Sequence, residues 1–381
     1  MGACMSALLQ SVEDLPLLDL LLRTAAADVS RALTCEDAGV ARDAMLLVSR
    51  LSAGDPSVAA QLLPPLLNDL MAVHRAGLHE PVQGPPSRLL NLRDPLARVY
   101  LAQCCSSMAG TEPQLAWRVL AQMAATDSSP WAAFEAATAL GGGLGPAAGR
   151  ASAWELLRSG LGIQLPGTPL PLGEALPSRL EQGVGSGEAA QVIACCRALL
   201  ALLTARAAHL EATGASGASP EEAKFTSRLR RAAERVCLST TASHAERCAG
   251  FVAYLAALDS AGAVEAELVR GVWEDLLFGL PKAPSSLTAP AIVARLLAPL
   301  PDLRPSIGGS LAIKLVTTLR ESRPELLADP VCLRHLARLW DSLGNAADPD
   351  SRRLAAASAM EAIAACGEAS CWYGCPYWLP R

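Results

Sequence analysis

The chain has 381 residues, of which 51% are hydrophobic and 4% aromatic, and its formal net charge is −5. Leu and Ala supply most of the apolar side chains and favour helix, whereas the residues that favour strands are scarce. A nucleic-acid-binding protein would carry a basic stripe. The short cluster Arg228, Arg230 and Arg231 is interpreted instead as a solvated helix face. Composition therefore predicts an all-helical protein that does not bind nucleic acid.

The first residues match a lipidation motif. Met1-Gly2-Ala3-Cys4-Met5-Ser6 fits the N-myristoylation pattern and places Cys4 for palmitoylation, so Gly2 and Cys4 are candidate lipidation sites. It resembles the acylated starts of some membrane-anchored signalling proteins. The alternative is an unmodified start, because no basic residues follow. We therefore expect membrane association only if the chain is acylated.

Other features indicate a cytoplasmic chain with reduced thiols. The twelve cysteines form no regular disulfide framework, and Glu13 and Asp14 come early where a secretory signal would be basic and then apolar. The longest apolar run, Val192 to Leu203, is interrupted by Arg197 and is too short to span a bilayer. We predict no membrane span.

Apolar residues at helical spacing, interrupted by Pro and Gly, predict a series of helices. An acidic residue or Ser repeatedly stands before a Pro, which is a helix start: the first residue caps free N–H groups and Pro fits the first turn. A repeated start signal suggests a repeated helical unit. These pairs are Asp55-Pro56, Asp94-Pro95, Glu112-Pro113, Ser129-Pro130, Ser219-Pro220, Asp329-Pro330 and Asp348-Pro349. The predicted helices are 5–34, as one helix or two, and then 37–53, 56–76, 93–109, 112–126, 130–141, 150–160, 187–212, 220–238, 242–259, 262–279, 288–299, 303–321, 323–343 and 349–366.

The main interruption is the Pro- and Gly-rich segment 161–186, interpreted as a loop or linker, with a partner-contacting segment as the alternative. It divides the chain into N-terminal helical repeats at 1–160 and C-terminal helical repeats at 187–366. Residues 367–381 form a tail of different composition.

That tail is rich in aromatic residues and cysteine. Cys366, Cys371 and Cys375 are one ligand short of a structural zinc site, so no metal is predicted there. The tail either docks its aromatics on the last repeat, or binds a partner as an exposed peptide, or is an altered chain end. We take its aromatics as the candidate partner-binding residues: Trp372, Tyr373, Tyr377 and Trp378.

No pattern in the sequence points to catalysis. The five histidines form no ligand pair, and there is no nucleophile elbow or phosphate loop. Gly141-Gly142-Gly143-Leu144-Gly145 follows a predicted helix and is interpreted as its stop. We predict no catalytic residue, no cofactor and no metal.

Three helix starts carry a family resemblance. The run from Asp348-Pro349, through Arg352, to Ile363 resembles the second half of a HEAT repeat, with Asp and Pro in the turn, Arg soon after and then small residues. Asp94-Pro95 with Arg98 is similar, and Ser129-Pro130 matches without the Arg. The resemblance implies an α-solenoid of stacked antiparallel helix pairs of HEAT/armadillo type.

From the fold class and the lack of catalytic motifs we expect a non-enzymatic protein–protein interaction scaffold or adaptor in the cytoplasm. One alternative is a membrane-associated adaptor in trafficking or adhesion, anchored by N-terminal acylation; the other is an enzyme on a helical scaffold. Five tryptophans are possible partner anchors, with core packing as the other interpretation: Trp117, Trp131, Trp154, Trp273 and Trp340.

Overall fold

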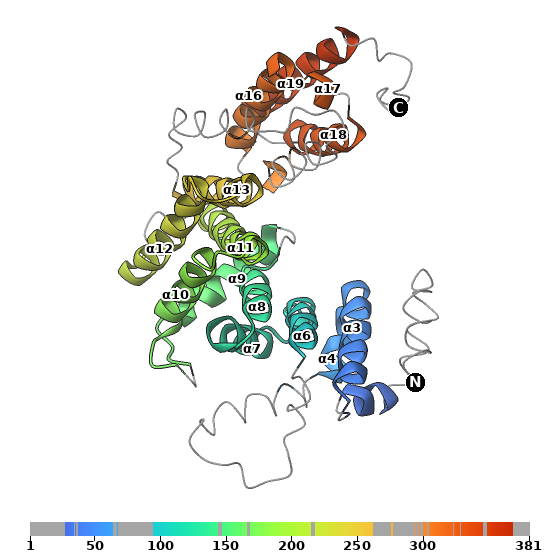
Figure 1. Ribbon diagram of the computed structural model, residues 1–381, viewed down its shortest axis with the longest axis vertical. Helices are drawn as coiled ribbons and strands as arrows, with labels where there is room; N and C mark the ends of the chain where they lie inside the picture. Colours follow the sequence, from blue (N-terminus) through green and yellow to red (C-terminus); the bar gives the residue numbers. More distant parts are fainter. Residues whose placement is uncertain are drawn as a thin grey trace. The chain divides into compact units, whose positions relative to one another are not determined.

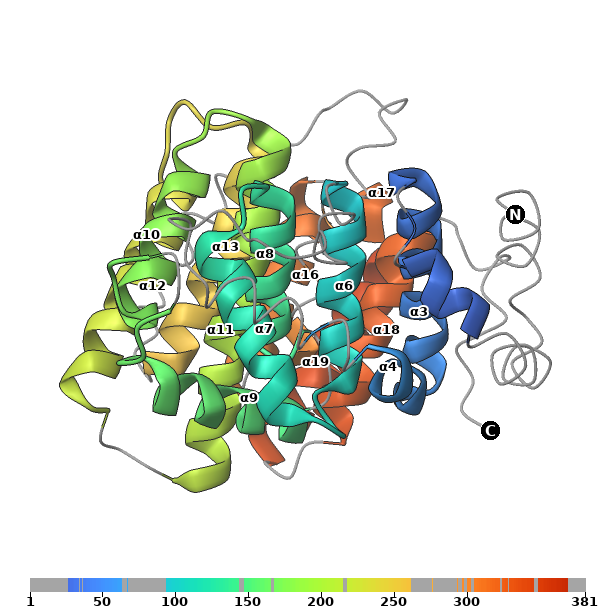
Figure 2. The same cartoon turned by 90° about the horizontal axis from the view of Figure 1, so that it is seen from below.

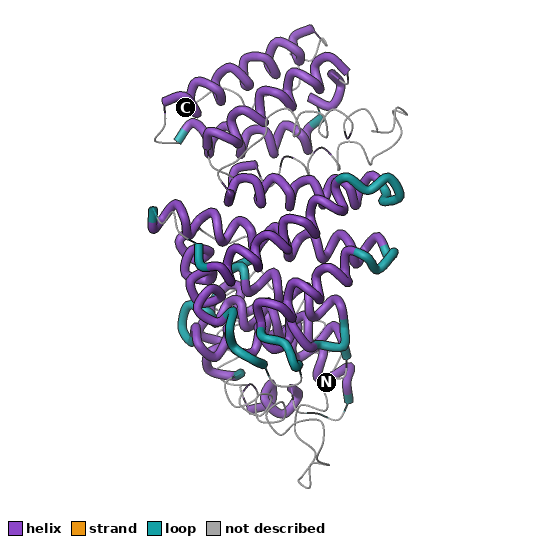
Figure 3. Tube along the Cα trace, turned by 90° about the vertical axis from the view of Figure 1, so that its left-hand side faces the viewer, coloured by secondary structure: helices purple, strands orange, loops and turns teal. Residues whose placement is uncertain are grey.

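The structure is a computed structural model. It describes residues 27–33, 35, 37–63, 67, 94–143, 147–165, 168–214, 218–261, 276, 293, 297, 300–302, 305–322, 324–327, 329–345 and 349–368. Over these residues the chain is helical, without a strand, as predicted (Figure 3). It divides into two compact units, Met1–Leu229 and Arg230–Arg381. The division falls inside a helix and not in the segment 161–186.

Most helices of the first unit begin within a few residues of the predicted starts, and α10 is the exception. Asp37, Asp55 and Asp94 each accept a hydrogen bond from a backbone N–H of the first turn that follows. The helices are α3 (Ala38–Gly54), α4 (Pro56–Leu62), α6 (Pro95–Met108), α7 (Pro113–Thr126), α8 (Pro130–Leu140), α9 (Ala147–Gly160), α10 (Leu172–Val184), α11 (Ala189–Thr213) and the first part of α12 (Pro220–Cys237).

Packing in this unit follows the chain. Helix α3 packs on α6, α6 on α8, and α8 on α11 (Figures 1 and 2). Helix α7 covers α6 and α8, α9 packs on α11, and α10 packs on α7 and α11. The predicted helix stop is confirmed at Gly142 and Gly143, whose φ angles of 74° and 60° lie in the left-handed region that glycine adopts freely.

Helix α11 is the central helix of the unit. It is long and apolar enough to cross a membrane by length and composition, but most of its most apolar stretch is buried inside the fold. A helix that is hydrophobic on all sides is typical of a core helix as well as of a membrane span. Its burial against α8, α9 and α10 accounts for its composition.

The interpretation of 161–186 as loop was wrong for its second half, which forms α10. Leu172, Leu176 and Leu180 are buried at helical spacing, and Pro171 occupies the N-cap position. Pro177 lies inside the helix. The many Pro and Gly residues of this segment predicted a loop, although the buried leucines stand at helical spacing. Tertiary packing can stabilise a helix that such a composition disfavours.

In the second unit, α16 packs on α19 and α18, and α18 packs on α19. The predicted helix 323–343 was wrong: it is two helices, because Asp329 caps a new start by accepting from the backbone N–H groups of Val331 and Cys332. Helices predicted at 262–279 and 288–299 lie almost wholly outside the described residues. The elements are α13 (His244–Ala261), η2 (Leu300–Asp302), α16 (Pro305–Ser322), α17 (Pro324–Leu327), α18 (Pro330–Gly344) and α19 (Pro349–Glu368).

Candidate interaction surface

A row of ion pairs joins α3, α6 and the turn before α8. Arg42 on α3 lies 3.5 Å from Asp94, the N-cap of α6. Arg98, one turn into α6, donates from Nε to both carboxylate oxygens of Asp127, at 3.2 and 3.0 Å. Arg42 thus reaches from α3 to the N-cap of α6, and Arg98 reaches from α6 to Asp127, the C-cap of α7, two residues before the N-cap of α8.

A second row of hydrogen bonds joins the same helices further along. Ser49 on α3 donates to Gln103 on α6 at 3.0 Å, and the Gln103 amide donates to Glu135 on α8 at 3.1 Å. Gln103 therefore uses both ends of its amide, one toward each neighbouring helix.

These two rows show that α3, α6 and α8 run parallel. In each helix the ion-pair residue comes first and the hydrogen-bonded residue follows, so sequence number rises in the same direction. Helix α11 continues the order: Phe134 and Cys195 both lie against Gly183, and further along Ala201 lies against Gly141 at the end of α8. Four parallel helices thus have their N-termini at one edge, which we call the N-terminal edge of the stack.

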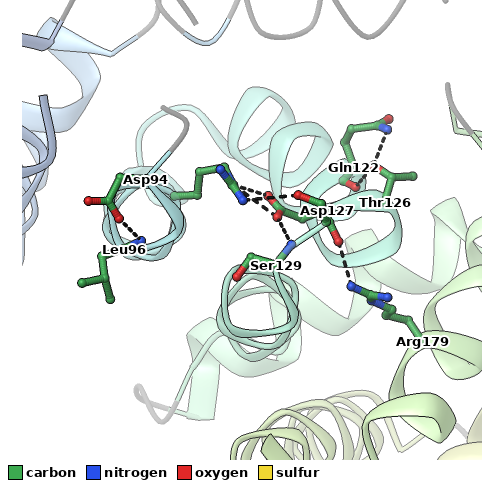
Figure 4. A network of polar contacts seen from close by, with 9 residues as sticks. Asp94, Leu96, Gln122, Thr126, Asp127, Ser129 and Arg179 are labelled. Carbon is green, nitrogen blue, oxygen red and sulfur yellow. Dashed lines mark hydrogen bonds and ion pairs between the residues drawn. The ribbon is translucent and has the colours of Figure 1, made fainter. Parts of the chain in front are cut away.

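Asp127 is the centre of the polar network at this edge (Figure 4). Its side chain, 7% exposed, also accepts from the backbone N–H of Ser129 at 2.7 Å. Its backbone carbonyl accepts from Arg179 on α10 at 2.8 Å. Asp127 therefore links α6, the start of α8 and α10, and this burial and pairing indicate a structural role.

Two large apolar side chains are exposed at the N-terminal edge. Leu96 and Trp131 are 50% and 39% exposed, and each is the second residue of its helix, α6 and α8. The equivalent residues of α3 and α11 are the small Gly39 and Ala190. The edge thus carries a pair of apolar side chains between two small residues, which is the kind of feature that anchors protein partners.

The other candidate tryptophans do not share this exposure. Trp117 and Trp154 are buried in the core. Trp340 is half-buried, and its indole N–H donates to Ser358 at 2.7 Å. Trp273 lies outside the described residues. Sequence alone did not separate Trp131 from these four.

The arginine cluster on α12 is not simply a solvated face. The Arg228 guanidinium donates to both carboxylate oxygens of Glu181 on α10, at 2.9 and 2.6 Å, and to Ser178 at 3.0 Å. Glu181 holds the pKa of Arg228 above its usual value. Arg230 lies over the Tyr254 ring, 5.9 Å from its centroid, while Arg231 is exposed. The Arg228 contacts fasten α12 to α10.

Of the described thiols, only Cys35 is partly exposed; the other seven are buried and therefore poor nucleophiles. Burial raises the pKa of Cys105, Cys237 and Cys332 to about 12, and raises the pKa of Cys104 and Cys195 well above the usual range. Buried in this way, these cysteines pack as small hydrophobic residues.

Other titratable side chains lie close to one another around α11. His209 is buried on this helix with Nε2 3.5 Å from a carboxylate oxygen of Glu155. Next to it on α11, Arg206 pairs with the buried Glu222 at 3.3 Å. Within the described part of the chain, no group of three or more His, Cys, Asp and Glu could hold a metal ion.

Several predicted sites lie outside the described residues and stay predictions. These are the lipidation candidates and the aromatic tail: Gly2, Cys4, Trp372, Tyr373, Tyr377 and Trp378.

Comparison with family models, with curated proteins and with solved structures gives no match to this chain. The N-terminal edge of the stack is therefore interpreted on its geometry alone.

Proposed function

We propose that this protein is a non-enzymatic protein–protein interaction scaffold of the cytoplasm, built as an α-solenoid of HEAT/armadillo type. The observation that carries the proposal is the parallel stack of α3, α6, α8 and α11, which contact one another in that order, with α7 between α6 and α8 in the chain and α9 and α10 between α8 and α11. In stacked repeats each unit contacts its neighbours through an equivalent face, and the two rows of polar bridges from α3 to α8 have this regularity.

The position of the exposed apolar side chains supports a binding role for the N-terminal edge. Leu96 and Trp131 lie in the first turns of α6 and α8, where Asp94 accepts from the Leu96 N–H and Asp127 accepts from the Ser129 N–H. A preorganised anchor loses little side-chain entropy on binding, and tryptophan is enriched among residues that dominate interface energy. A partner segment lying across the edge would cover both side chains.

The experiment is quantitative affinity purification of the full-length chain from cells. The test variant is Leu96→Ala/Trp131→Ala, and the matched control is Leu238→Ala/Val331→Ala, which removes two apolar side chains of similar exposure, 48% and 45%, outside the stack. We expect stoichiometric partners that the test variant loses by about tenfold or more and the control retains.

Two outcomes would count against the proposal in different ways. If the wild-type chain retains no stoichiometric partner, the scaffold function is contradicted. If the test variant keeps its partners while its melting temperature is unchanged, binding occurs elsewhere and the N-terminal edge is not the site.

A further inference from the structure

Helix α12 carries four basic residues in one row. Lys224, Arg228, Arg231 and Arg235 follow one another at steps of four, three and four residues, which places them on one stripe of the helix. The first two are paired with α10, whereas the last two are exposed. The row is thus divided into a paired part, which belongs to the first unit, and an open part, which belongs to the second.

Helix α10 shows which chemistry matches the paired part of the row. Lys224 donates to Glu174 at 2.8 Å. Arg228 donates to both carboxylate oxygens of Glu181 and to the Ser178 hydroxyl. Glu174, Ser178 and Glu181 stand at steps of four and three residues on α10, which is the spacing found along the basic row. An acidic helix with this spacing is therefore complementary to the row.

The open part of the row has no such cover within the described part of the chain. Arg231 and Arg235 are exposed, and neither forms an ion pair with a described residue. Glu234, which stands between them in the chain, is half-buried and pairs with neither. The last acidic residue of α10 is Glu181, and only uncharged residues follow it up to the end of the helix at Val184. Both exposed guanidinium groups therefore face solvent.

Other contacts hold the second half of α12 in place. Arg247 on α13 donates to the backbone carbonyl of Cys237, in the last turn of α12, at 3.3 Å. A Cβ at Gly250 on α13 would lie 2.7 Å from the backbone nitrogen of Cys237, so the two helices are in direct contact. The two exposed arginines are thus presented from a fixed backbone, and a partner that binds them orders only their side chains.

We infer that the open part of the row is a docking surface for an acidic helical segment of a partner protein. Arg231 and Arg235 are separated by about 6 Å along the helix axis, so carboxylates four residues apart on a helix lying alongside would meet both. The chain has a formal net charge of −5, so general attraction does not bring an acidic segment to it and the contact is local. This inference concerns α12 and does not depend on partner binding at the N-terminal edge.

The test is fluorescence anisotropy of a labelled peptide titrated with the full-length chain. The probe is an alanine-based helix of about 16 residues with glutamates four residues apart, and the same peptide with glutamines is its control. The variant is Arg231→Gln/Arg235→Gln. The matched control, Arg50→Gln/Arg118→Gln, removes the same charge from two other exposed helix positions. We expect the control to bind the glutamate peptide like the wild-type chain, and the variant to bind it at least about fivefold more weakly.

A charge reversal separates local pairing from an effect of net charge. Arg231→Glu/Arg235→Glu should lose the glutamate peptide and should bind the same helix with lysines in place of the glutamates. Arg50→Glu/Arg118→Glu gives the chain the same net charge and should do neither. Melting temperatures within about 2 °C of the wild-type value show that the fold is intact in each variant.

Three results would overturn the inference. The first is no binding of the glutamate peptide to the wild-type chain at concentrations up to about 1 mM. The second is an equal loss of binding in the variant and in its matched control. The third is binding of a single-stranded RNA oligonucleotide that depends on Arg231 and Arg235 while the peptide does not bind, which would assign the surface to nucleic acid.

Discussion

The α6–α8 interface and the α8–α11 interface hold parallel helices together by different chemistry. Helices α6 and α8 are tied through Arg98–Asp127 and Gln103–Glu135. Helices α8 and α11 meet instead through Phe134 and Cys195 around Gly183, and through the close approach of Gly141 to Ala201. Polar bridges fix which residues face each other, whereas dense apolar packing tolerates little change in volume. We therefore expect substitutions at these two interfaces to lower the free energy of unfolding by different amounts.

The largest effect is expected at the tight contact between α8 and α11. A Cβ at Gly141 would lie 2.5 Å from the carbonyl carbon of Ala201, a backbone atom that cannot rotate away. Gly141→Ala should lower the free energy of unfolding by about 3 kcal/mol. Urea denaturation measures this. The control is Gly149→Ala in α9, where nothing lies within 4 Å and the helix should gain about 0.5 kcal/mol. Equal effects of the two substitutions would contradict the close packing.

A smaller effect is expected from the buried ion pair between α6 and the turn before α8. Asp127→Ala leaves Arg98, only 19% exposed, without its carboxylate, and removes the acceptor of the Ser129 N–H. The cost should be about 2–3 kcal/mol. Asp127→Asn, which can still accept from Ser129, should cost less. A double-mutant cycle with Arg98→Met measures the coupling free energy between Arg98 and Asp127. A value near zero would contradict the role of Asp127 as the centre of the polar network.

The outer ion pair of the same row should matter least among the substitutions. Arg42 and Asp94 are more exposed than Arg98 and Asp127, and exposed pairs contribute little. In a cycle of Arg42→Met with Asp94→Asn, which keeps the cap of α6, the coupling should be below about 1 kcal/mol. A coupling larger than that of Arg98 with Asp127 would reverse the order proposed for the two pairs.

The buried thiols should make the stability depend on pH only in the alkaline range. Burial raises the folded-state pKa of Cys105, Cys237 and Cys332 from 9.0 to about 12, so the folded protein keeps protons that the unfolded chain releases. Their contribution is complete below pH 9 and is lost as the pH rises toward 12. Thermal melts between pH 7 and 11 should show a decline beginning above pH 9. If these thiols were alkylated rapidly in the folded protein at pH 8, they would be accessible to solvent, and this would contradict their burial.

The sequence predicted the helical class and most helix starts, because a capping residue and a following Pro act locally. It missed α10, whose buried leucines stand among prolines, and it joined α17 to α18 across Asp329-Pro330. The N-terminal edge of the stack could not be predicted in the same way. Arg98 stood in a recognised pattern, but its partner Asp127 is 29 residues away and becomes its neighbour only when α6 and α8 pack. The exposure of Trp131 likewise depends on packing and not on local sequence.

The most direct test of the account is the direction of α11 relative to α8. Spin labels on non-natural amino acids, which avoid the twelve cysteines, would be placed at exposed positions 131, 190 and 211 for electron–electron distance measurement. In a parallel stack the backbone distance between positions 131 and 190 is about 10–15 Å, and the measured value also includes the lengths of the two labels. The distance between positions 131 and 211 is longer by roughly 15–20 Å. This order would support four N-termini at one edge. The reverse order, with residue 211 nearer to residue 131, would contradict the parallel stack and the scaffold proposed from it.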